Sequence, residues 1–258
     1  MWSMRAPSVF DASVAVVMAT LASMPLARAQ ADERPTALDP VVVTATRRDE
    51  RSFDVPASVD TIDGTTIRNG QPAINLSETL VRVPGVFAAN RGNYAQDLQI
   101  SSRGFGGRAT FGVRGVRLYQ DFIPATMPDG QGQTGSFSLL SAQRIEVLRG
   151  PFSTLYGNAS GGVIAVFTQE PAPLPVALAS ASAGSFRTLN AGWLASGTEA
   201  GMGYVVAGNH FDTAGYRAHS AATRDLVNAK LVFNVADATR VTVIGSSQHQ
   251  PDAQDPLG

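Results

Sequence analysis

Five runs of alternating apolar and polar residues in the C-terminal part of the chain constrain its fold more than any other feature. They span residues 176–184, 186–196, 202–212, 225–235 and 239–249. Successive side chains of a β-strand point to opposite faces, so each run predicts a strand with one apolar and one polar face. Runs of about ten such residues are typical of a transmembrane β-barrel. A soluble sandwich with one solvated face produces the same alternation.

Low charge favours the membrane over the soluble alternative. Charged residues make up 16% of the 258-residue chain, against about 25% in soluble domains. The hydrophobic share, 44%, is ordinary. A net charge of −1 gives no electrostatic reason to expect nucleic acid as a partner. The absence of cysteine excludes disulfide bonds and thiolate metal sites.

Residues 1–29 have the features of a cleaved export signal. Arg5 stands near the start, a mostly apolar stretch runs from Val14 to Leu26, and the segment ends in the small-residue motif Ala27-Arg28-Ala29. The apolar stretch is shorter than the ~20 residues that a spanning helix needs, and no later segment is long and apolar enough. We therefore expect an exported protein that can enter a bilayer only as strands.

Residues 30–52 predict a flexible arm, because they are rich in charged residues and contain two prolines. Within the arm lies a β-prone island, Val41 to Thr46, with no neighbouring strand in the sequence to pair with. Two interpretations remain open. The island adds a strand to the sheet of a partner protein, or it is an ordinary N-terminal edge strand.

Residues 53–170 predict a small α+β domain with short elements. A helix is expected from Asn75, because this N-cap residue is followed by Glu78 and by apolar residues on one face until Pro84. Short strands between glycine-rich turns are expected at residues 57–62, 98–101, 113–119, 145–148 and 163–167.

The sequence argues against catalysis. Residues 104–109 fit the Gly-x-Gly-x-x-Ala dinucleotide pattern, but β-prone residues follow where that pattern requires a helix. Residues 157–161 differ from a nucleophile elbow because the serine stands one place late. The three histidines lack metal-ligand spacing. We therefore expect that the protein is not an enzyme and has no metal site or cofactor.

Three segments resemble TonB-dependent outer-membrane receptors. Residues 39–47, Asp-Pro-Val-Val-Val-Thr-Ala-Thr-Arg, resemble the TonB box of that family. Residues 102–105 and 119–124 resemble its paired plug motifs. The longest similarity begins with Arg-Ile-Glu-Val-Leu-Arg-Gly-Pro at residues 144–151 and continues to residue 164. The resemblance implies an α+β plug domain at 53–170, followed from 171 by the start of an antiparallel transmembrane β-barrel of about five strands.

The resemblance also implies a function. Such receptors sit in the outer membrane of Gram-negative bacteria and import a scarce ligand, most often a ferric siderophore, through a 22-stranded barrel that the plug fills. TonB and its inner-membrane energising complex drive the import. A receptor for cobalamin, another metal chelate or a saccharide is an alternative ligand class, and a soluble periplasmic binding module is an alternative of another kind. The expected partners are TonB, the ligand and outer-membrane lipid.

Three sets of site residues follow from the resemblance. The expected latch between plug and barrel consists of Arg103, Glu146 and Arg149, in which arginine forks would meet barrel carboxylates. The expected ligand-facing apex of the plug consists of Asp121, Met127, Asp129 and Gln131. The expected TonB-binding residues are Pro40, Val41, Val42, Val43, Thr44 and Ala45.

Two departures from the family limit what the resemblance implies. Phe122 stands where the family usually has glycine, so we expect the turn at Asp121 to differ. The alternating runs provide only about five strands, and five strands would leave an open edge in lipid, since small barrels already need about eight. We therefore expect a fragment of a longer protein or a truncated product.

Overall fold

The computed structural model describes residues 42–43, 50–51, 55, 57–90, 92–109, 112–150, 153–157, 159–236 and 238–255. The predicted export signal lies outside these residues, and so does most of the predicted arm. All described residues belong to one compact unit that spans residues 41–258.

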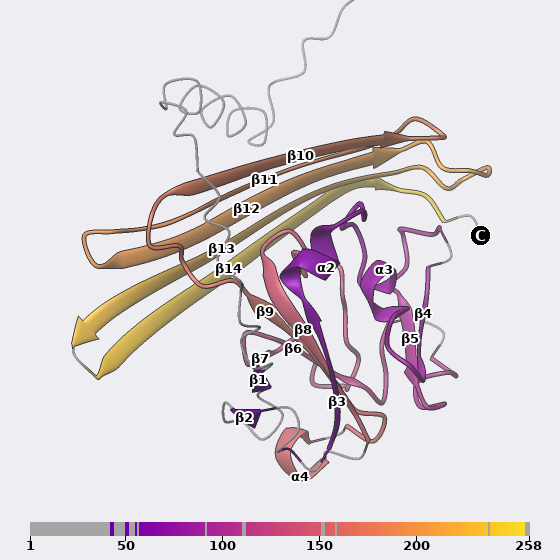
Figure 1. Ribbon diagram of the computed structural model, residues 1–258. Coiled ribbons are helices and arrows are strands. Elements are labelled where there is room, and N and C mark those ends of the chain that lie inside the picture. The colour runs from indigo at the N-terminus through magenta and orange to yellow at the C-terminus, as the bar shows by residue number, and fades with distance from the viewer. Residues whose placement is uncertain are drawn as a thin grey trace, which may run out of the picture. The chain divides into compact units, whose positions relative to one another are not determined.

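The N-terminal domain contains a mixed five-stranded sheet in the order β3-β8-β9-β6-β7 (Figure 1). Strand β8 pairs antiparallel with both β3 and β9, whereas β6 pairs parallel with β9. We call residues 55–170 the mixed domain. The strands are β3 (Ser58–Asp63), β6 (Arg117–Gln120), β7 (Ile123–Pro124), β8 (Ala142–Arg149) and β9 (Val163–Thr168).

Two short helices and a strand pair complete the mixed domain: α2 (Gly64–Arg68), α3 (Ser77–Leu80), β4 (Val86–Ala89) and β5 (Gln99–Ser102). Ile67, Leu76 and Leu80 bury their side chains in the core that covers one face of the sheet. A further helix, α4 (Ser153–Tyr156), follows β8. The expected α+β class is confirmed, and each predicted strand overlaps an observed one.

A side-chain cap marks the start of α2, whereas the N-cap residue of α3, Leu76, has no side-chain cap and Glu78 instead binds the backbone just before it. Asp63 accepts a hydrogen bond from the Thr66 backbone N–H at 2.8 Å, and hydrogen bonds from Thr65 and Thr66 lower the Asp63 pKa to about 2. Glu78 accepts hydrogen bonds from the backbone N–H groups of Asn75 and Ile74 at 3.0 and 3.1 Å. This is the glutamate half of a capping box, as the Asn75 pattern predicted.

The C-terminal strands form a second sheet in the order β10-β11-β12-β13-β14, with every neighbouring pair antiparallel (Figure 1). We call it the wall sheet. Its strands are β10 (Val176–Gly184), β11 (Thr188–Glu199), β12 (Met202–Thr213), β13 (Ala222–Ala236) and β14 (Thr239–Ala253). The five alternating runs therefore each form one strand.

The two faces of the wall sheet differ as the alternation predicted. On β13, Asn228 and Lys230 are 0% and 5% exposed, whereas Val227 and Val235 are exposed. The buried polar residues face the mixed domain, since their side chains make hydrogen bonds to it. Among the described residues, the structure contains no helix whose length and apolar character would let it cross a membrane.

The turn between β6 and β7 answers the question raised by Phe122. Asp121 and Phe122 both have positive φ angles, +48° and +67°. A two-residue hairpin with positive φ at both central positions is the type I′ turn, which favours glycine at the second position. Phe122 therefore adopts a backbone that glycine would adopt without strain. Its ring packs edge-on against Phe167, with ring centroids 5.1 Å apart.

Candidate functional site

The boundary between the mixed domain and the wall sheet gathers buried polar side chains from both. Asn190 on β11 donates a hydrogen bond to the Pro72 carbonyl at 2.6 Å, and Arg224 on β13 donates one to the Ile74 carbonyl at 2.6 Å. Gln250 on β14 donates to the Tyr94 carbonyl at 2.7 Å. A buried polar group that lacks a partner is costly. These bonds therefore fix how the two parts meet.

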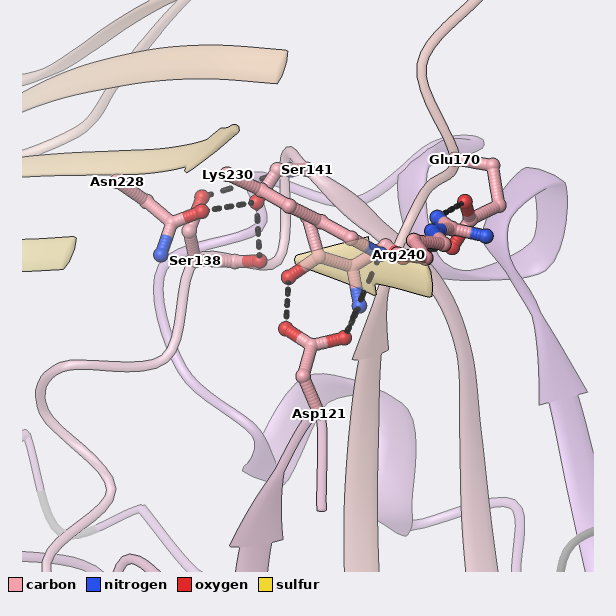
Figure 2. Close-up of polar contacts among 8 residues, drawn as sticks. Asp121, Ser138, Ser141, Glu170, Asn228, Lys230 and Arg240 are labelled. Atoms are coloured by element: carbon pink, nitrogen blue, oxygen red, sulfur yellow. Dashed lines mark hydrogen bonds and ion pairs between the residues drawn. The ribbon is translucent and has the colours of Figure 1, made fainter. Parts of the chain in front are cut away.

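Lys230 is the centre of a charged cluster at this boundary (Figure 2). Its ammonium group donates to the Glu170 carboxylate at 2.8 Å and to the Thr168 carbonyl at 3.2 Å. It lies 3.9 Å from the Asp121 carboxylate. Arg240 on β14 also contacts Glu170. We call Asp121, Thr168, Glu170, Lys230 and Arg240 the Lys230 cluster; its two carboxylates come from the mixed domain and its two cations from the wall sheet.

The carboxylates of the cluster are held in different ways. Asp121 is buried and accepts hydrogen bonds from the Thr168 backbone N–H at 2.8 Å and from its hydroxyl at 2.6 Å. Glu170 is half exposed. Burial alone would raise the Glu170 pKa, but hydrogen bonds from Lys230 and Arg240 outweigh burial and lower it. Glu170 is therefore ionised at neutral pH, beside the two cations that it contacts.

A second group, which we call the serine–asparagine layer, lies beside the cluster and consists of Ser138, Ser141, Asn228 and Ser246. The Ser141 hydroxyl lies 3.2 Å from the Asn228 side-chain oxygen and 3.3 Å from the Ser138 carbonyl. The Asn228 amide donates to the Ser246 hydroxyl at 2.9 Å. Ser141 and Asn228 are both 0% exposed. The layer joins the mixed domain to β13 and β14 through uncharged groups alone, and Figure 2 shows its members Ser138, Ser141 and Asn228.

Two cavities lie along the same boundary. The amide cavity has a volume of about 250 Å³ and is lined mostly by side-chain amides and hydroxyls, including Asn75, Asn93, Gln96, Gln133, Gln248 and Gln250. The charged cavity has a volume of about 670 Å³, and its lining includes Asp121, Arg144, Glu170, Lys230, Arg240 and Thr242. Both volumes fall near or within the range of small-molecule sites.

Partly or fully buried ionisable groups lie in or near the lining of the amide cavity. Burial raises the pKa values of Asp97 and Tyr94. Burial also raises the Glu78 pKa, although hydrogen bonds from backbone N–H groups and the charge of Arg224 oppose that rise. Arg224 is 8% exposed, and its Nε atom has no hydrogen-bond partner among the described residues. The cavity thus presents many neutral hydrogen-bonding groups and one buried guanidinium group.

The contacts described for the predicted latch residues join parts of the mixed domain to one another. Arg149 forms an ion pair with Asp60 at 2.6 Å and donates to the Pro84 carbonyl at 2.8 Å. Glu146 is 1% exposed and pairs with Arg144 at 2.8 Å. Arg103 is exposed, with its backbone N–H bonded to the Gly85 carbonyl. The latch remains a prediction.

The structure separates Asp121 from the other predicted apex residues. Asp129 and Gln131 both contact Arg114, at 3.3 and 3.2 Å, and Met127 is 52% exposed. Asp121, in contrast, is buried against Thr168 and faces Lys230. The tight turn folds the Asp121 carboxylate back onto the end of β9, where it also lines a cavity, and the ligand-facing role of these four residues remains a prediction.

Sequence reasoning did not find the amide cavity. Its lining comes from two loops of the mixed domain, residues 93–98 and 133–136, and from β13 and β14. The available signal was the density of Asn and Gln in these loops, with Asn93, Gln96 and Gln133 between predicted elements. That signal gives no indication of which loops meet, because the loops lie far apart in the sequence.

Only Val42 and Val43 of the predicted TonB-binding residues are described. They form β1 (Val42–Val43), which pairs antiparallel with β2 (Glu50–Arg51). The expectation that this island lacks a neighbouring strand was therefore wrong. Pro40, Val41, Thr44 and Ala45 lie outside the described residues. Among the described residues, no group of three or more His, Asp or Glu side chains could hold a metal ion.

Comparison with known proteins finds similarity to one family of receptors. Residues 51–163 match the family model of the TonB-dependent receptor plug domain. The pesticin receptor of Yersinia pestis is 35% identical over 141 residues, which cover 52% of this chain and 19% of the receptor. The hemin receptor of the same organism is 30% identical over 165 residues, which cover 61% of this chain and 23% of the receptor.

The fold agrees with this match. The structure of the pyoverdine outer membrane receptor from Pseudomonas aeruginosa superposes with a TM-score of 0.68 at 18% identity. The superposition covers 81% of this chain and 30% of that receptor. The chain thus spans between a fifth and a third of the length of these relatives.

Proposed function

Since residues 51–163 match the plug domain of the TonB-dependent receptors, we propose that the chain belongs to that family and forms the plug and the first wall strands of an outer-membrane importer. The mixed domain is the plug, and the wall sheet is the part of the barrel that it contacts. The matched family is one of receptors, in agreement with the prediction that the chain is not an enzyme.

One observation carries this proposal. On β13 the wall sheet buries the polar side chains of Asn228 and Lys230 toward the plug and exposes the apolar side chains of Val227 and Val235 on its other face. A soluble sandwich would bury its apolar face instead. An apolar outer face and a polar inner face are what a strand between lipid and a filled lumen requires.

The proposed ligand is a ferric chelate. Related proteins are named for hemin and pyoverdine, and the ferric yersiniabactin uptake receptor of Yersinia pestis shares the fold. The amide cavity supports an oxygen-rich ligand, because its amide and hydroxyl groups can donate and accept several hydrogen bonds. Cobalamin, another metal chelate and a saccharide are the competing ligand classes.

The proposed coupling runs through the arm. Pro40 to Ala45 would add as a strand to TonB, which the inner-membrane complex energises. The internal pairing of β1 with β2 spans two residues on each strand. So short a ladder is weak in isolation, and a longer strand pairing with a partner can replace it. Export through a cleaved signal at residues 1–29 would bring the protein to the outer membrane.

Uptake measurements test the proposal. Cells producing the protein receive ⁵⁵Fe-hemin, ⁵⁵Fe-pyoverdine or ⁵⁷Co-cobalamin, and the chelate that is taken up identifies the ligand class. Deletion of residues 41–46 should abolish uptake and leave binding intact. In a finer comparison, Val42→Pro removes a strand donor while Val42→Thr keeps a β-branched residue, so only the proline variant should lose uptake. Unchanged uptake in the deletion variant, or recovery of the protein in the soluble periplasmic fraction, would contradict the proposal.

We also propose the latch between plug and barrel that the family resemblance implies. Arg103, Glu146 and Arg149 would hold the plug against barrel carboxylates. Arg149→Ala should then increase hydrogen exchange at the plug surface and raise passive leak, with Arg108→Ala as a control on an exposed loop arginine. An exchange profile equal to that of the control would count against the latch.

A further inference from the structure

The two cavities and the serine–asparagine layer occur in the same order along three separate chain segments. In the plug, residues 133–136 line the amide cavity, Ser138 and Ser141 belong to the layer, and residues 143–144 line the charged cavity. The two cavities are therefore neighbours along the plug surface, with the layer between them.

Strands β13 and β14 repeat this order. On β13, Arg224 lines the amide cavity, Asn228 belongs to the layer and Lys230 lines the charged cavity. β14 runs in the opposite direction. There Gln248 lines the amide cavity, Ser246 belongs to the layer and Ile244 lines the charged cavity. At a rise of about 3.3 Å per residue, the six steps from Arg224 to Lys230 span about 20 Å.

The layer that separates the cavities is thin. Asn228 and Ser246 are register partners on the two strands. The next residues that share the Ser246 face of β14, Ile244 and Gln248, already line the two cavities. The wall pair Asn228 and Ser246, which Ser141 of the plug contacts, thus lies between the residues that line the cavity of about 250 Å³ and those that line the cavity of about 670 Å³.

The chemistry of the layer suits a closure that can open. Hydroxyl and amide groups hold it, so breaking the Ser141 to Asn228 contact leaves no unpaired charge. Water or a hydrophilic solute can take over the hydrogen bonds of Ser141 and Asn228. The Lys230 cluster next to it differs, because separating its ions inside the protein carries a larger cost. The weakest barrier along the boundary is therefore the uncharged layer.

We propose that the seam between plug residues 133–144 and strands β13 and β14 is the route by which a hydrophilic, oxygen-rich solute crosses this part of the receptor, and that the contact of Ser141 with Asn228 is its gate. This inference rests on the proposed function, because the solute is the imported chelate. Amides in the first cavity and the cations Arg144, Lys230 and Arg240 in the second provide donors for oxygen ligands along the whole seam.

Cysteine substitution tests the gate, because the chain contains no native cysteine. Ser141→Cys places a thiol in the layer. Ser196→Cys is its matched control, since Ser196 is 1% exposed, lies on β11 away from the seam and bonds to the Ala172 backbone N–H. Cells producing either variant take up ⁵⁵Fe-hemin or ⁵⁵Fe-pyoverdine in the presence of the membrane-impermeant reagent 2-(trimethylammonium)ethyl methanethiosulfonate, with and without an uncoupler.

The thiol at position 141 should react at least about tenfold faster in energised cells than in uncoupled cells, a ratio that corresponds to about 1.4 kcal/mol. The thiol at position 196 should show no such change. If iron uptake proceeds while the reactivity of the thiol at position 141 is the same in energised and uncoupled cells, the contact of Ser141 with Asn228 is not a gate. If the reactivity of both thiols rises equally in energised cells, the plug loosens as a whole and the seam is not a specific route for the solute. Absence of iron uptake in the unsubstituted protein would instead contradict the proposed function.

A second measurement does not depend on energised import. The double variant Ser141→Ala, Asn228→Ala removes the layer contacts, and the matched double variant Thr188→Ala, Thr213→Ala removes a 2.8 Å hydrogen bond between β11 and β12 within the wall sheet. Vancomycin, a large hydrophilic solute that an intact outer membrane excludes, is the probe. The first variant should lower the inhibitory vancomycin concentration several-fold relative to the second. Equal sensitivity of the two would overturn the seam.

Discussion

Replacement of Lys230 by methionine tests how the wall sheet holds the plug. Methionine keeps most of the length and volume of lysine and removes the ammonium group. The Thr168 carbonyl then loses its 3.2 Å hydrogen bond from Lys230, and Glu170 loses its 2.8 Å bond. Glu170 keeps its contact with Arg240, and Asp121 keeps both hydrogen bonds from Thr168.

The expected loss follows from these contacts. Removing one partner of a fully buried ion pair costs about 3–5 kcal/mol. Glu170 is half exposed and keeps its ion pair with Arg240, so the loss of Lys230 costs little at the Glu170 carboxylate. A buried carbonyl without a donor costs about 1–3 kcal/mol, and removal of the buried ammonium recovers part of its desolvation cost. The net destabilisation of plug docking is therefore about 2 kcal/mol.

Hydrogen exchange detected by mass spectrometry measures this loss locally. Exchange in the peptide around residues 165–172 should accelerate about 30-fold for a loss of about 2 kcal/mol. Arg240→Met is the matched control, since Arg240 is half exposed and its removal should cost about 0–1 kcal/mol. Exchange equal to that of Arg240→Met would refute the reasoning. Slower exchange would show that the burial cost of Lys230 exceeds its interactions.

Three further outcomes are expected from other contacts. Arg149→Met should destabilise the plug by about 1–3 kcal/mol, seen as a lower denaturant midpoint, because the carboxylate of Asp60 and the carbonyl of Pro84 lose their donors. Phe122→Gly should be more stable than Phe122→Ala by about 1 kcal/mol in thermal unfolding, because only glycine relieves the positive φ. Acidification should loosen plug docking, measured by exchange between pH 7 and pH 3. The folded-state pKa of Glu170 is lowered, so its contribution is present above its ordinary pKa of 4.5 and lost as pH falls below that value.

The sequence was most informative where local periodicity decides the structure. Alternation in residues 225–235 indicated that Asn228 and Lys230 share one face of a strand and Val227 and Val235 the other, and the wall sheet has these faces. Glu78 likewise contacts the backbone at Asn75, three residues before it, as the capping pattern predicted. Such features depend on neighbours within a few residues.

The sequence was least informative where distant segments meet. The amide cavity depends on loops at residues 93–98 and 133–136 that β13 and β14 then close, and no periodicity relates these segments. The position of the Asp121 carboxylate was equally hard to predict, because the type I′ turn and the end of β9 determine where it lies. The pairing of Val42 and Val43 with Glu50 and Arg51 was also missed, because charged residues gave no strand signal.

The topology of the two sheets also bears on the order in which they form. Every pairing in the wall sheet joins strands that are adjacent in the sequence. The plug sheet instead requires Ser58 to meet Arg149 and a parallel pairing of β6 with β9, so its closure brings together residues far apart in the chain. Loop closure of this kind slows folding, whereas hairpins form from local contacts. The wall hairpins can therefore assemble first and offer Asn190, Arg224 and Lys230 as a template on which the plug completes its sheet.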